Sequence, residues 1–402
     1  MQRRSLLVGT GAAFASGITD VFAQNPLAAT NPGLSDGTRA EAVMDSLPGK
    51  SPLIKLSYRP PNYESPVSAF TTPLTQREDF FVRYHLSQIP DRAALADWSL
   101  TIGGDAAGKT IKLSLADLKA LPQQEIAAVC QCSGNRRGLS SPHVAGVQWG
   151  VGAMGCALWR GPRLRDVLAL AGIQPQAVEI AFHGTDHGVL EATPQFAKSI
   201  PIPRAMDDNT LIALAMNDEE MPVWNGFPAR LVVPGWTGTY WMKHISNLDI
   251  RTQKLDNFWM KAAYRVPTGM FPGSDFPTQD NATNRPITDI LINSLATSHD
   301  DNATVRSSGF TLSGMAWDNG SGIARVDVWL SSGETWSVAM IGIEESRFAF
   351  RPWSIQLAAS PGPFTVRIRA TSNSGSVQPE KPIFNPAGYH HNAIQTLRLT
   401  AI

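Results

Sequence analysis

The stretch AVCQCSGNRRGLSSPH, residues 128–143, places two of the chain's three cysteines one residue apart and follows them with two arginines. Cys130 and Cys132 are a poor disulfide pair, because closing so short a ring strains its geometry. An odd number of cysteines also leaves at least one thiol without a bridge inside the chain. A lone thiol beside Arg136 and Arg137 therefore needs an explanation.

Three roles fit these thiols. All three, including Cys156, can be small buried core residues, which is common for free cysteine. A nucleophilic cysteine would need a histidine, and His143 is the nearby candidate. A metal-binding thiolate would need a cofactor to supply the other ligands, because the sequence has no C-x-x-C or C-x-x-C-H pattern. In that case the adjacent arginines would favour the thiolate and hold an anion beside the metal.

Outward from this stretch, helical and strand patterns alternate. Residues 29–80 are rich in Pro, Gly, Ser and Thr and predict an extended arm, with short helical possibilities near 39–47. The alternation around 80–85 predicts a strand. The remaining patterns predict a hairpin over 98–114, a helix over 115–121 with Ser114 as N-cap, a helix over 161–173 ending at Gly172, and strands within 178–188, 229–236 and 241–250. The first unit is therefore expected to mix helices and strands.

The chain changes character near residue 280, after a Pro- and Gly-rich segment. Beyond it, short alternating runs such as FTLSGMAWD, RVDVWLSS, TWSVAMI and FTVRIRATS are separated by turn signals such as DNGSG. In one run Val366, Ile368 and Ala370 share a face that is opposite to Thr365 and Arg367. The final ~120 residues are therefore expected to form a β-sandwich.

The first 28 residues predict an export signal. Arg3 and Arg4 precede a mildly apolar, Gly/Ala-rich segment, as in a twin-arginine leader; a Sec-type leader with two incidental arginines is the alternative. Export of an already folded protein favours a cofactor inserted before export, and it predicts a periplasmic location. No later window is apolar for ~18 residues, so no membrane-spanning helix is expected.

Composition sets few further limits. The 402 residues are 43% hydrophobic and 17% charged, as in ordinary globular proteins. Lysine plus arginine (34) equals aspartate plus glutamate (34), so overall charge gives no reason to expect nucleic acid or an anionic membrane as partner.

Several separated motifs resemble one family. CSGNRRG after a strand, preceded by FFVRYHL and followed by GFPARLVVPGWTGTYWMKHI and FWMKAAYRVP, is similar to the sulfite oxidase family of molybdenum–molybdopterin enzymes. The resemblance runs from about Phe80 to the carboxy-terminal sandwich. It implies an α+β fold: a sulfite-oxidase-type molybdopterin domain at 29–280, followed by an immunoglobulin-like β-sandwich at 281–402 that serves dimerisation or a partner.

The resemblance also implies roles for individual residues. Cys132 would be the single protein ligand of molybdenum, and Cys130 and Cys156 would be core residues. Arg83, Arg137 and Tyr264 would bind the substrate and act in catalysis, because forked guanidinium groups suit a small oxyanion. The segments that contact the pterin would supply Phe81, Val82, Arg83, Tyr84, His85, Cys132, Asp186, Asn225, Arg230, Trp241, Met242 and Lys243. Asn225 stands where many relatives carry histidine, and Trp159 and Trp259 are candidates for the pocket wall.

The implied activity is oxidation of sulfite to sulfate at one Mo-molybdopterin per chain. Because the chain has no haem-attachment motif, the two electrons would leave singly to a separate c-type cytochrome. The sandwich would support either a homodimer or a heterodimer with that cytochrome. The alternatives are an exported molybdopterin reductase of methionine sulfoxide or a similar S- or N-oxide, and a non-enzymatic binding protein that carries a sandwich.

Overall fold

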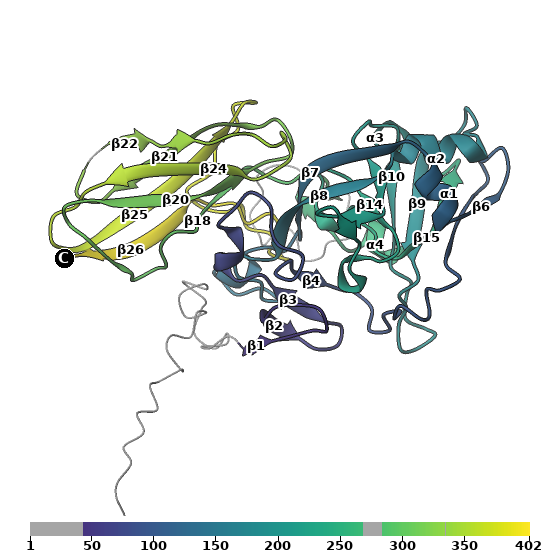
Figure 1. Ribbon diagram of the computed structural model, residues 1–402, viewed down its shortest axis with the longest axis horizontal. Coiled ribbons are helices and arrows are strands. Elements are labelled where there is room, and N and C mark those ends of the chain that lie inside the picture. The colour runs from purple at the N-terminus through teal and green to yellow at the C-terminus, as the bar shows by residue number, and fades with distance from the viewer. Residues whose placement is uncertain (1–42, 268–283, 334) are drawn as a thin grey trace, which may run out of the picture.

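The computed structural model describes residues 43–267, 284–333 and 335–402. The predicted leader at 1–28 and the predicted domain boundary near residue 280 therefore lie outside the described residues. Figure 1 shows a β-sandwich at one end of the molecule and a mixed α/β module at the other. The fold class predicted from the sequence is confirmed.

The mixed module is built on a five-stranded sheet in the order β10-β9-β15-β5-β6, where only the β15–β5 pair is parallel. Its strands are β5 (Ser99–Gly103), β6 (Ile111–Ser114), β9 (Glu179–Gly184), β10 (Ala197–Pro201) and β15 (Ile245–Arg251). Helices α1 (Leu115–Ala120) and α2 (Leu164–Ala171) pack beside it. Both helix ends are as predicted, because Ser114 accepts a hydrogen bond from the Asp117 amide and Gly172 ends α2 at φ 75°.

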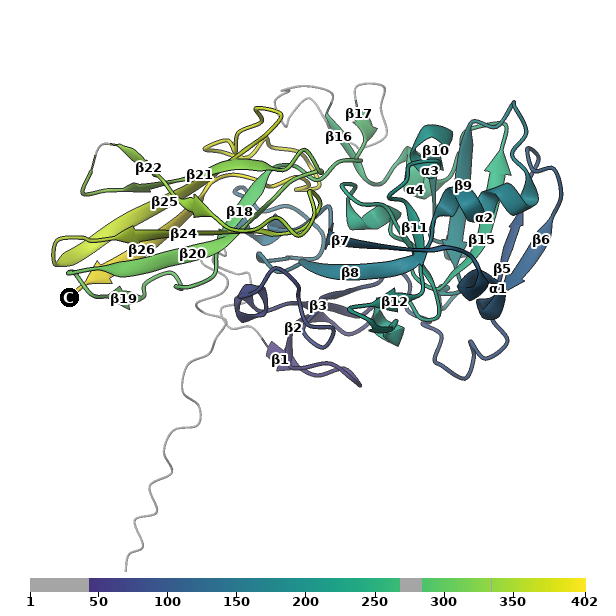
Figure 2. The same ribbon diagram turned by 45° about the horizontal axis from the view of Figure 1, so that its top comes forward.

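A second sheet carries the cysteine motif. Its order is β13-β12-β8-β7, with β7 (Gln123–Gln131), β8 (Met154–Pro162), β12 (Ala215–Met216) and β13 (Glu219–Glu220). Strands β7 and β8 pair along their whole length and run from the mixed module toward the sandwich (Figure 2). The loop that joins them begins at Cys132 and holds the two arginines, so it emerges where the modules meet.

Short elements complete the mixed module. They are the pairs β11 (Leu211–Ala213) with β14 (Arg230–Val232) and β16 (Arg265–Pro267) with β17 (Asn284–Pro286), the helices α3 (Ile202–Ala205) and α4 (Phe258–Lys261), and the 3-10 turns η2 (Arg137–Leu139), η3 (Val223–Asn225) and η4 (Gly238–Tyr240).

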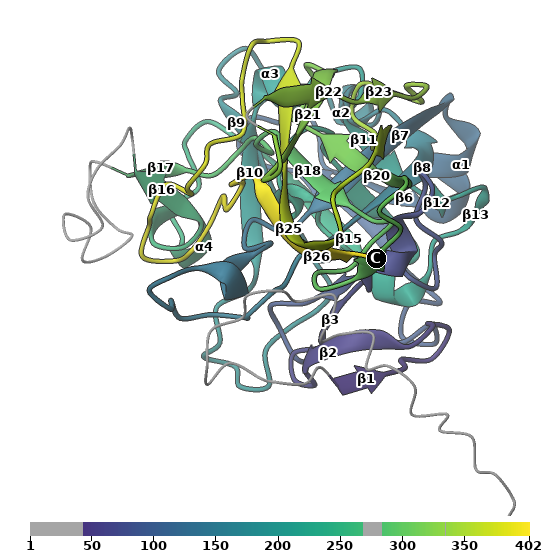
Figure 3. The same ribbon diagram turned by 90° about the vertical axis from the view of Figure 1, so that its left-hand side faces the viewer.

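The amino-terminal part differs from the predicted extended arm. It forms a sheet of β1 (Val43–Asp45), β2 (Leu53–Ser57), β3 (Asn62–Glu64) and β4 (Val82–Arg83), with the turn η1 (Val67–Phe70). This sheet lies to one side of the sandwich in the end view of Figure 3. Helix near 39–47 is wrong over the described residues, which begin in a strand. The strand predicted at 80–85 shrinks to Val82–Arg83, the two residues that pair with β3.

The sandwich follows its alternation closely. Its two sheets, in the orders β18-β20-β24-β23 and β19-β26-β25-β21-β22, contain β18 (Asn293–Ala296), β19 (Thr304–Val305), β20 (Phe310–Trp317), β21 (Ile323–Leu330), β22 (Trp336–Val338), β23 (Met340–Ile341), β24 (Arg351–Leu357), β25 (Gly362–Ser372) and β26 (Gln395–Ala401). Val366, Ile368 and Ala370 are fully buried between the sheets, as predicted. Across the described ranges, no helix has the length and apolar character needed to cross a bilayer.

Candidate active site

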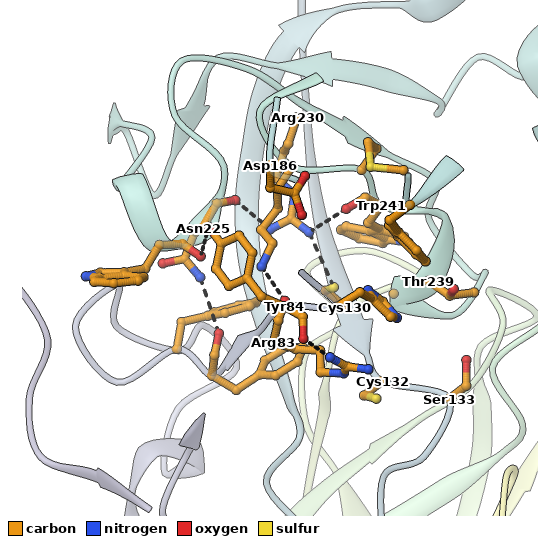
Figure 4. A pocket seen from close by; sticks show the side chains of 18 of the residues that line it. Arg83, Tyr84, Cys130, Cys132, Ser133, Asp186, Asn225, Arg230, Thr239 and Trp241 are labelled. Atoms are coloured by element: carbon orange, nitrogen blue, oxygen red, sulfur yellow. Dashed lines mark hydrogen bonds between the residues drawn. The ribbon is translucent and has the colours of Figure 1, made fainter. Parts of the chain in front are cut away.

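One cavity of the mixed module gathers most of the residues singled out in the sequence. Its wall includes Phe81, Arg83, Tyr84, His85, Cys132, Asp186, Asn225, Arg230, Trp241, Met242, Lys243 and Tyr264. Among the side chains labelled in Figure 4, Arg83 and Tyr84 come from β4 and its end, Cys130 and Cys132 from the end of β7, Asp186 from the loop after β9, and Asn225, Arg230, Thr239 and Trp241 from the stretch that begins at η3 and precedes β15. Segments far apart in sequence therefore meet around Cys132.

The loop after β7 holds Cys132 in place through its backbone. The Cys132 amide donates to the Ala153 carbonyl at 2.9 Å, and the Ala153 amide donates to the Asn135 side-chain oxygen at 3.0 Å. The buried carboxylate of Glu64 accepts the amides of Gly150 and Gly152, each at 2.7 Å, and so fixes the facing segment. Cys132 itself is 7% exposed and lines the cavity. No other thiol or histidine is needed to hold the loop.

Cations dominate the cavity wall. Arg83, Arg230 and Lys243 line it, and Asp186 is the one carboxylate among the lining residues that the structure describes. Burial lowers the pKa of Lys243 well below its usual range, with nearby Arg230 acting in the same direction. Burial also lowers the pKa of Arg230, whose guanidinium donates to the carbonyls of Asn225 and Trp241. Burial of these positive charges away from water costs free energy unless an anion binds beside them.

A polar scaffold supports this wall. His244 donates its Nδ1 proton to the Phe227 carbonyl at 2.6 Å, which leaves Nε2 to accept from the Tyr84 hydroxyl at 2.7 Å. Burial lowers the pKa of His244 to about 3, in agreement with a neutral ring. Asn225 accepts a hydrogen bond from the buried Lys50 ammonium at 2.6 Å. Asn225 and Tyr84 are therefore locked in orientation before any ligand binds.

A hydrogen-bonded group at the end of β4 consists of Arg83, His85 and Tyr264. The Arg83 guanidinium donates to the Tyr264 hydroxyl at 3.5 Å, and this hydroxyl also contacts His85 Nε2. Burial, with Arg83 nearby, lowers the pKa of His85 well below its usual range, so the ring is neutral, and its tautomer decides whether Nε2 donates to the phenol or accepts from it. Burial raises the pKa of Tyr264 above its ordinary value, which keeps the phenol protonated. The group can bind an anion through the guanidinium and the phenolic O–H.

Two predicted residues lie away from the cavity. Val82 is fully buried and packs with Leu53 and Tyr63 in the amino-terminal sheet. Arg137 does not line the cavity; its Nε donates to the Ala387 carbonyl at 2.7 Å, and its guanidinium lies 5.1 Å from the Tyr389 ring centre. The forked contact between Arg137 and a substrate therefore stays a prediction, and in this structure the guanidinium lies beside the cavity wall and not in it.

The neighbouring cysteines and tryptophans also differ in part from expectation. Cys130 belongs to the buried core, as expected, but it also lines the cavity, 3.8 Å from an Arg230 nitrogen, and burial raises its pKa to about 11. Cys156 is fully buried in apolar surroundings. Trp159 lies behind the wall, 4.9 Å beneath the Arg230 guanidinium, and Trp259 packs against Phe196; neither lines the cavity.

Sequence reasoning missed several wall residues: Phe80, Ser133, Phe196, Trp224, Gly238 and Thr239. Gly238 carried a signal, because it sits among bulky neighbours in GWTGTYW. A Cβ there would lie 3.2 Å from the Cys130 sulfur, so the backbone itself forms the wall. Thr239 and Phe196 carried no such signal, since their positions depend on long-range packing.

The wall fits a molybdopterin. The pterin–dithiolene cofactor carries a phosphate, and Arg230 and Lys243 are buried cations without an ion pair among the described residues. The buried Thr239 hydroxyl and Arg230 Nε also lack hydrogen-bond partners. No group of three His, Cys, Asp or Glu side chains in the described ranges could hold a metal by itself. A metal at Cys132 would thus need ligands from an organic group, which is what a dithiolene supplies.

Comparison with known proteins identifies the family. Residues 86–259 match the oxidoreductase molybdopterin-binding domain, and residues 284–400 match the Mo-co oxidoreductase dimerisation domain. Sulfite oxidase of Gallus gallus is 33% identical over 349 residues, which cover 83% of this chain and 74% of that protein. The chain belongs to the sulfite oxidase family. The family predicted from the motifs around Cys132 is confirmed.

Two other members and neighbours define the extent of the likeness. Mitochondrial sulfite oxidase of Homo sapiens is 34% identical over 366 residues, which cover 86% of this chain and 65% of that protein. The present chain thus matches about two thirds of the human protein's length. The crystal structure of the sulfane dehydrogenase SoxCD from Paracoccus pantotrophus superposes with a TM-score of 0.73 at 23% identity, covering 97% of this chain and 93% of that one. The fold is shared along nearly the whole chain.

Proposed function

We propose that the protein oxidises sulfite to sulfate at a Mo-molybdopterin bound in the cavity beside Cys132. The observation that carries this proposal is the convergence of the Cys132 thiol, three cations and a protonated tyrosine on a single cavity. The reaction consumes one sulfite and one water and yields sulfate, two protons and two electrons. When bound, the cofactor supplies the redox centre that transfers the oxygen atom and accepts both electrons.

Residues of the chain divide the work of holding the cofactor. Cys132 provides the thiolate for the metal, and its loop is already fixed by the Ala153 and Asn135 contacts. Arg230 and Lys243 neutralise the phosphate, and Asn225 and Trp241 border the same part of the wall. Because these groups are buried and hydrogen-bonded in advance, little ordering is left to occur on binding.

Arg83 and Tyr264 face the substrate. Sulfite is largely a dianion near neutral pH, so the Arg83 guanidinium attracts it and orients its oxygens. The Tyr264 phenol donates a hydrogen bond to the same anion. His85, neutral and in contact with that phenol, donates its Nε2 proton to the phenolic oxygen in one tautomer, which leaves the phenolic proton for the anion. Arg137 adds positive charge from behind Tyr389 without touching the cavity.

Electrons leave the site one at a time. We propose a separate c-type cytochrome as acceptor, in support of which the sequence offers no haem-attachment motif of its own. The twin-arginine leader supports a periplasmic site of action. The sandwich, which matches a dimerisation domain, offers a surface for a second copy or for the cytochrome.

The test is a sulfite assay on molybdenum-loaded protein. Sulfite-dependent reduction is followed with ferricyanide and, separately, with a c-type cytochrome, so that the substrate and the acceptor are tested independently. Loaded protein that reduces neither acceptor contradicts the sulfite assignment. Reduction of methionine sulfoxide instead would establish the reductase alternative.

Cys132→Ser is the decisive variant. Because residues that merely orient metal ligands cost 10–100-fold when changed, loss of the ligand itself should lower turnover per chain by more than about a hundredfold. Cys156→Ala is the matched control, since it removes a buried thiol away from the cavity. Equal activity of Cys132→Ser and wild type would exclude the thiolate role.

A further inference from the structure

The sandwich contributes a side chain next to the substrate-facing tyrosine. Tyr389 lies in the connection from β25 to β26 and is 8% exposed. Its ring stacks on the Tyr264 ring with centres 5.4 Å apart and planes inclined by 21°. The same ring lies under the Arg137 guanidinium at 5.1 Å. Tyr389 therefore contacts both residues that the proposed reaction needs beside Arg83.

The backbone around Tyr389 is held on every side. Asn385 accepts the Tyr389 amide at 2.9 Å and donates to the Tyr389 carbonyl at 2.8 Å. The next amide, of His390, donates to the Ser133 carbonyl at 3.1 Å, which ties the connection to the residue after Cys132. A ring clamped in this way can impose its position on its neighbours.

Arg137 and Tyr264 have little freedom of their own. The Arg137 side chain is packed so tightly that a Cβ on Gly134 would lie 2.6 Å from its guanidinium nitrogens. Tyr264 adopts a left-handed backbone conformation with φ 58°, which a bulky residue keeps only where its surroundings enforce it. Tyr389 is the side chain that both residues share.

Tyr389 also separates two cavities. A second cavity of about 300 Å³ lies on its other border, lined by Ser140, Lys381, Asn385, Gly388, Tyr389 and His391 among others. Tyr264 lines the first cavity and Tyr389 the second, so the stacked pair stands between them. Removal of the Tyr389 ring would open Tyr264 to this second space.

From this geometry we infer that Tyr389 is a positioning residue, which aligns the Tyr264 phenol and the Arg137 guanidinium and shields them from the second cavity. The inference rests on the proposed sulfite oxidation for its kinetic consequence. It goes beyond that proposal by assigning to the sandwich a direct part in setting the site. Tyr389 acts through its neighbours and does not line the first cavity.

Activity and titration test the inference together. Tyr389→Leu removes the stacked ring, and because a cation–π contact and an aromatic stack are lost, kcat/KM per bound molybdenum should fall about tenfold. Tyr389→Phe keeps the ring and should stay within about threefold of wild type. Tyr58→Leu, an exposed tyrosine, is the matched control.

Titration of Tyr264 gives a readout that needs no turnover. Burial is the main cause that raises the pKa of Tyr264, so opening its wall in Tyr389→Leu should make it ionise at lower pH. Tyrosinate absorbance of cofactor-free protein, with Tyr264→Phe as the blank, reports this. The titratable and charged groups that face Tyr264 are Arg83, His85, Cys132, Arg137, Lys198 and Tyr389.

The outcomes separate cleanly. Wild-type kcat/KM together with wild-type titration in Tyr389→Leu overturns the inference, and so does a Tyr389→Phe variant as impaired as Tyr389→Leu. If Tyr389→Leu does not fold, Tyr389→Met fills more of the space and carries the same expectations. If loaded wild type does not oxidise sulfite, the proposed function fails, while the titration still decides the role of Tyr389.

Discussion

In the sandwich the buried carboxylates of Asp301 and Asp327 lie against arginines of the same module, whereas in the cavity the buried cations do not meet matching carboxylates. Asp327, 1% exposed, accepts hydrogen bonds from Arg325 and lies 3.5 Å from an Arg369 nitrogen. Asp186 is the one described carboxylate that lines the cavity with Arg230 and Lys243. Neither cation makes an ion pair within the described residues. The buried charge of Asp327 is thus balanced within the sandwich, whereas the buried cations of the cavity have no carboxylate partner among the described residues.

This difference teaches where to expect a cofactor. A folded chain tolerates a buried charge when the partner is supplied, and a partner from outside the chain serves as well as one within it. Burial of the unpaired cations lowers the stability of the cofactor-free protein, and binding of the anionic pterin would offset this loss. Each prediction below either breaks this contrast or measures it.

The largest effect is expected for Lys243→Met. Loss of one charged hydrogen-bond donor to a buried phosphate should weaken cofactor retention by up to about a hundredfold. At the same time the cofactor-free protein should be no less stable than wild type, because a cation disfavoured by burial has been removed. Pterin fluorescence after gel filtration and urea unfolding measure the two effects. Undiminished retention would show that Lys243 does not meet the cofactor.

A smaller effect of opposite kind is expected for Asp327→Asn. The variant replaces the carboxylate that Arg325 and Arg369 contact by a neutral amide, so the charge-assisted hydrogen bonds are lost and the free energy of unfolding should fall by about 2 kcal/mol. Pterin content per folded chain should stay unchanged, since the site lies in the other module. Urea unfolding with cofactor analysis checks both. Loss of pterin from folded Asp327→Asn would mean that the contrast between modules is not one of charge.

The last effect is a dependence of stability on pH. Lys198 is fully buried, donates to the Trp259 carbonyl at 2.7 Å, and burial lowers its pKa to about 7 from 10.5. Between these values the unfolded chain binds the extra proton, so raising the pH favours the folded state, by at most ~1.4 kcal/mol per pH unit. The stability gained by Lys198→Met over wild type should therefore shrink from pH 7.5 toward pH 9.5, roughly across that window.

Lys109→Met, at an exposed position, provides the control for this measurement. Its difference from wild type should be constant across the same pH range in urea unfolding of cofactor-free protein. A gap for Lys198→Met that stays constant too would show that the buried amine keeps its proton in the folded state.

Periodicity predicted the sandwich and the regular parts of the mixed module. Val366, Ile368 and Ala370 could be assigned to one face because each strand has one buried and one exposed side. The same rule failed around Phe80 and Val82, where both sides are buried. It also failed before Leu47, where the three residues of β1 are too few to show a period.

The site itself was reached by motif and not by pattern. Cys132, Arg83 and Lys243 stand in recognisable segments, and the structure brings them to one cavity. The position of Arg137 beside the cavity wall could not be predicted from the sequence. Its guanidinium contacts Tyr389 and the carbonyl of Ala387, which is 250 residues away in the sandwich. Long-range contacts of this kind leave no local trace in a sequence.

Arg136 has a consequence for how the enzyme can be divided. Its backbone is left-handed at φ 67°, and its buried guanidinium donates to the carbonyls of Ser294 and Ala393, on the far side of the module boundary. Truncation after residue 267 would remove both acceptors of the Arg136 guanidinium, which belongs to the loop that begins at Cys132. The loop that carries Cys132 is therefore tied to the sandwich by hydrogen bonds, so a partner that displaces the sandwich would also displace this loop.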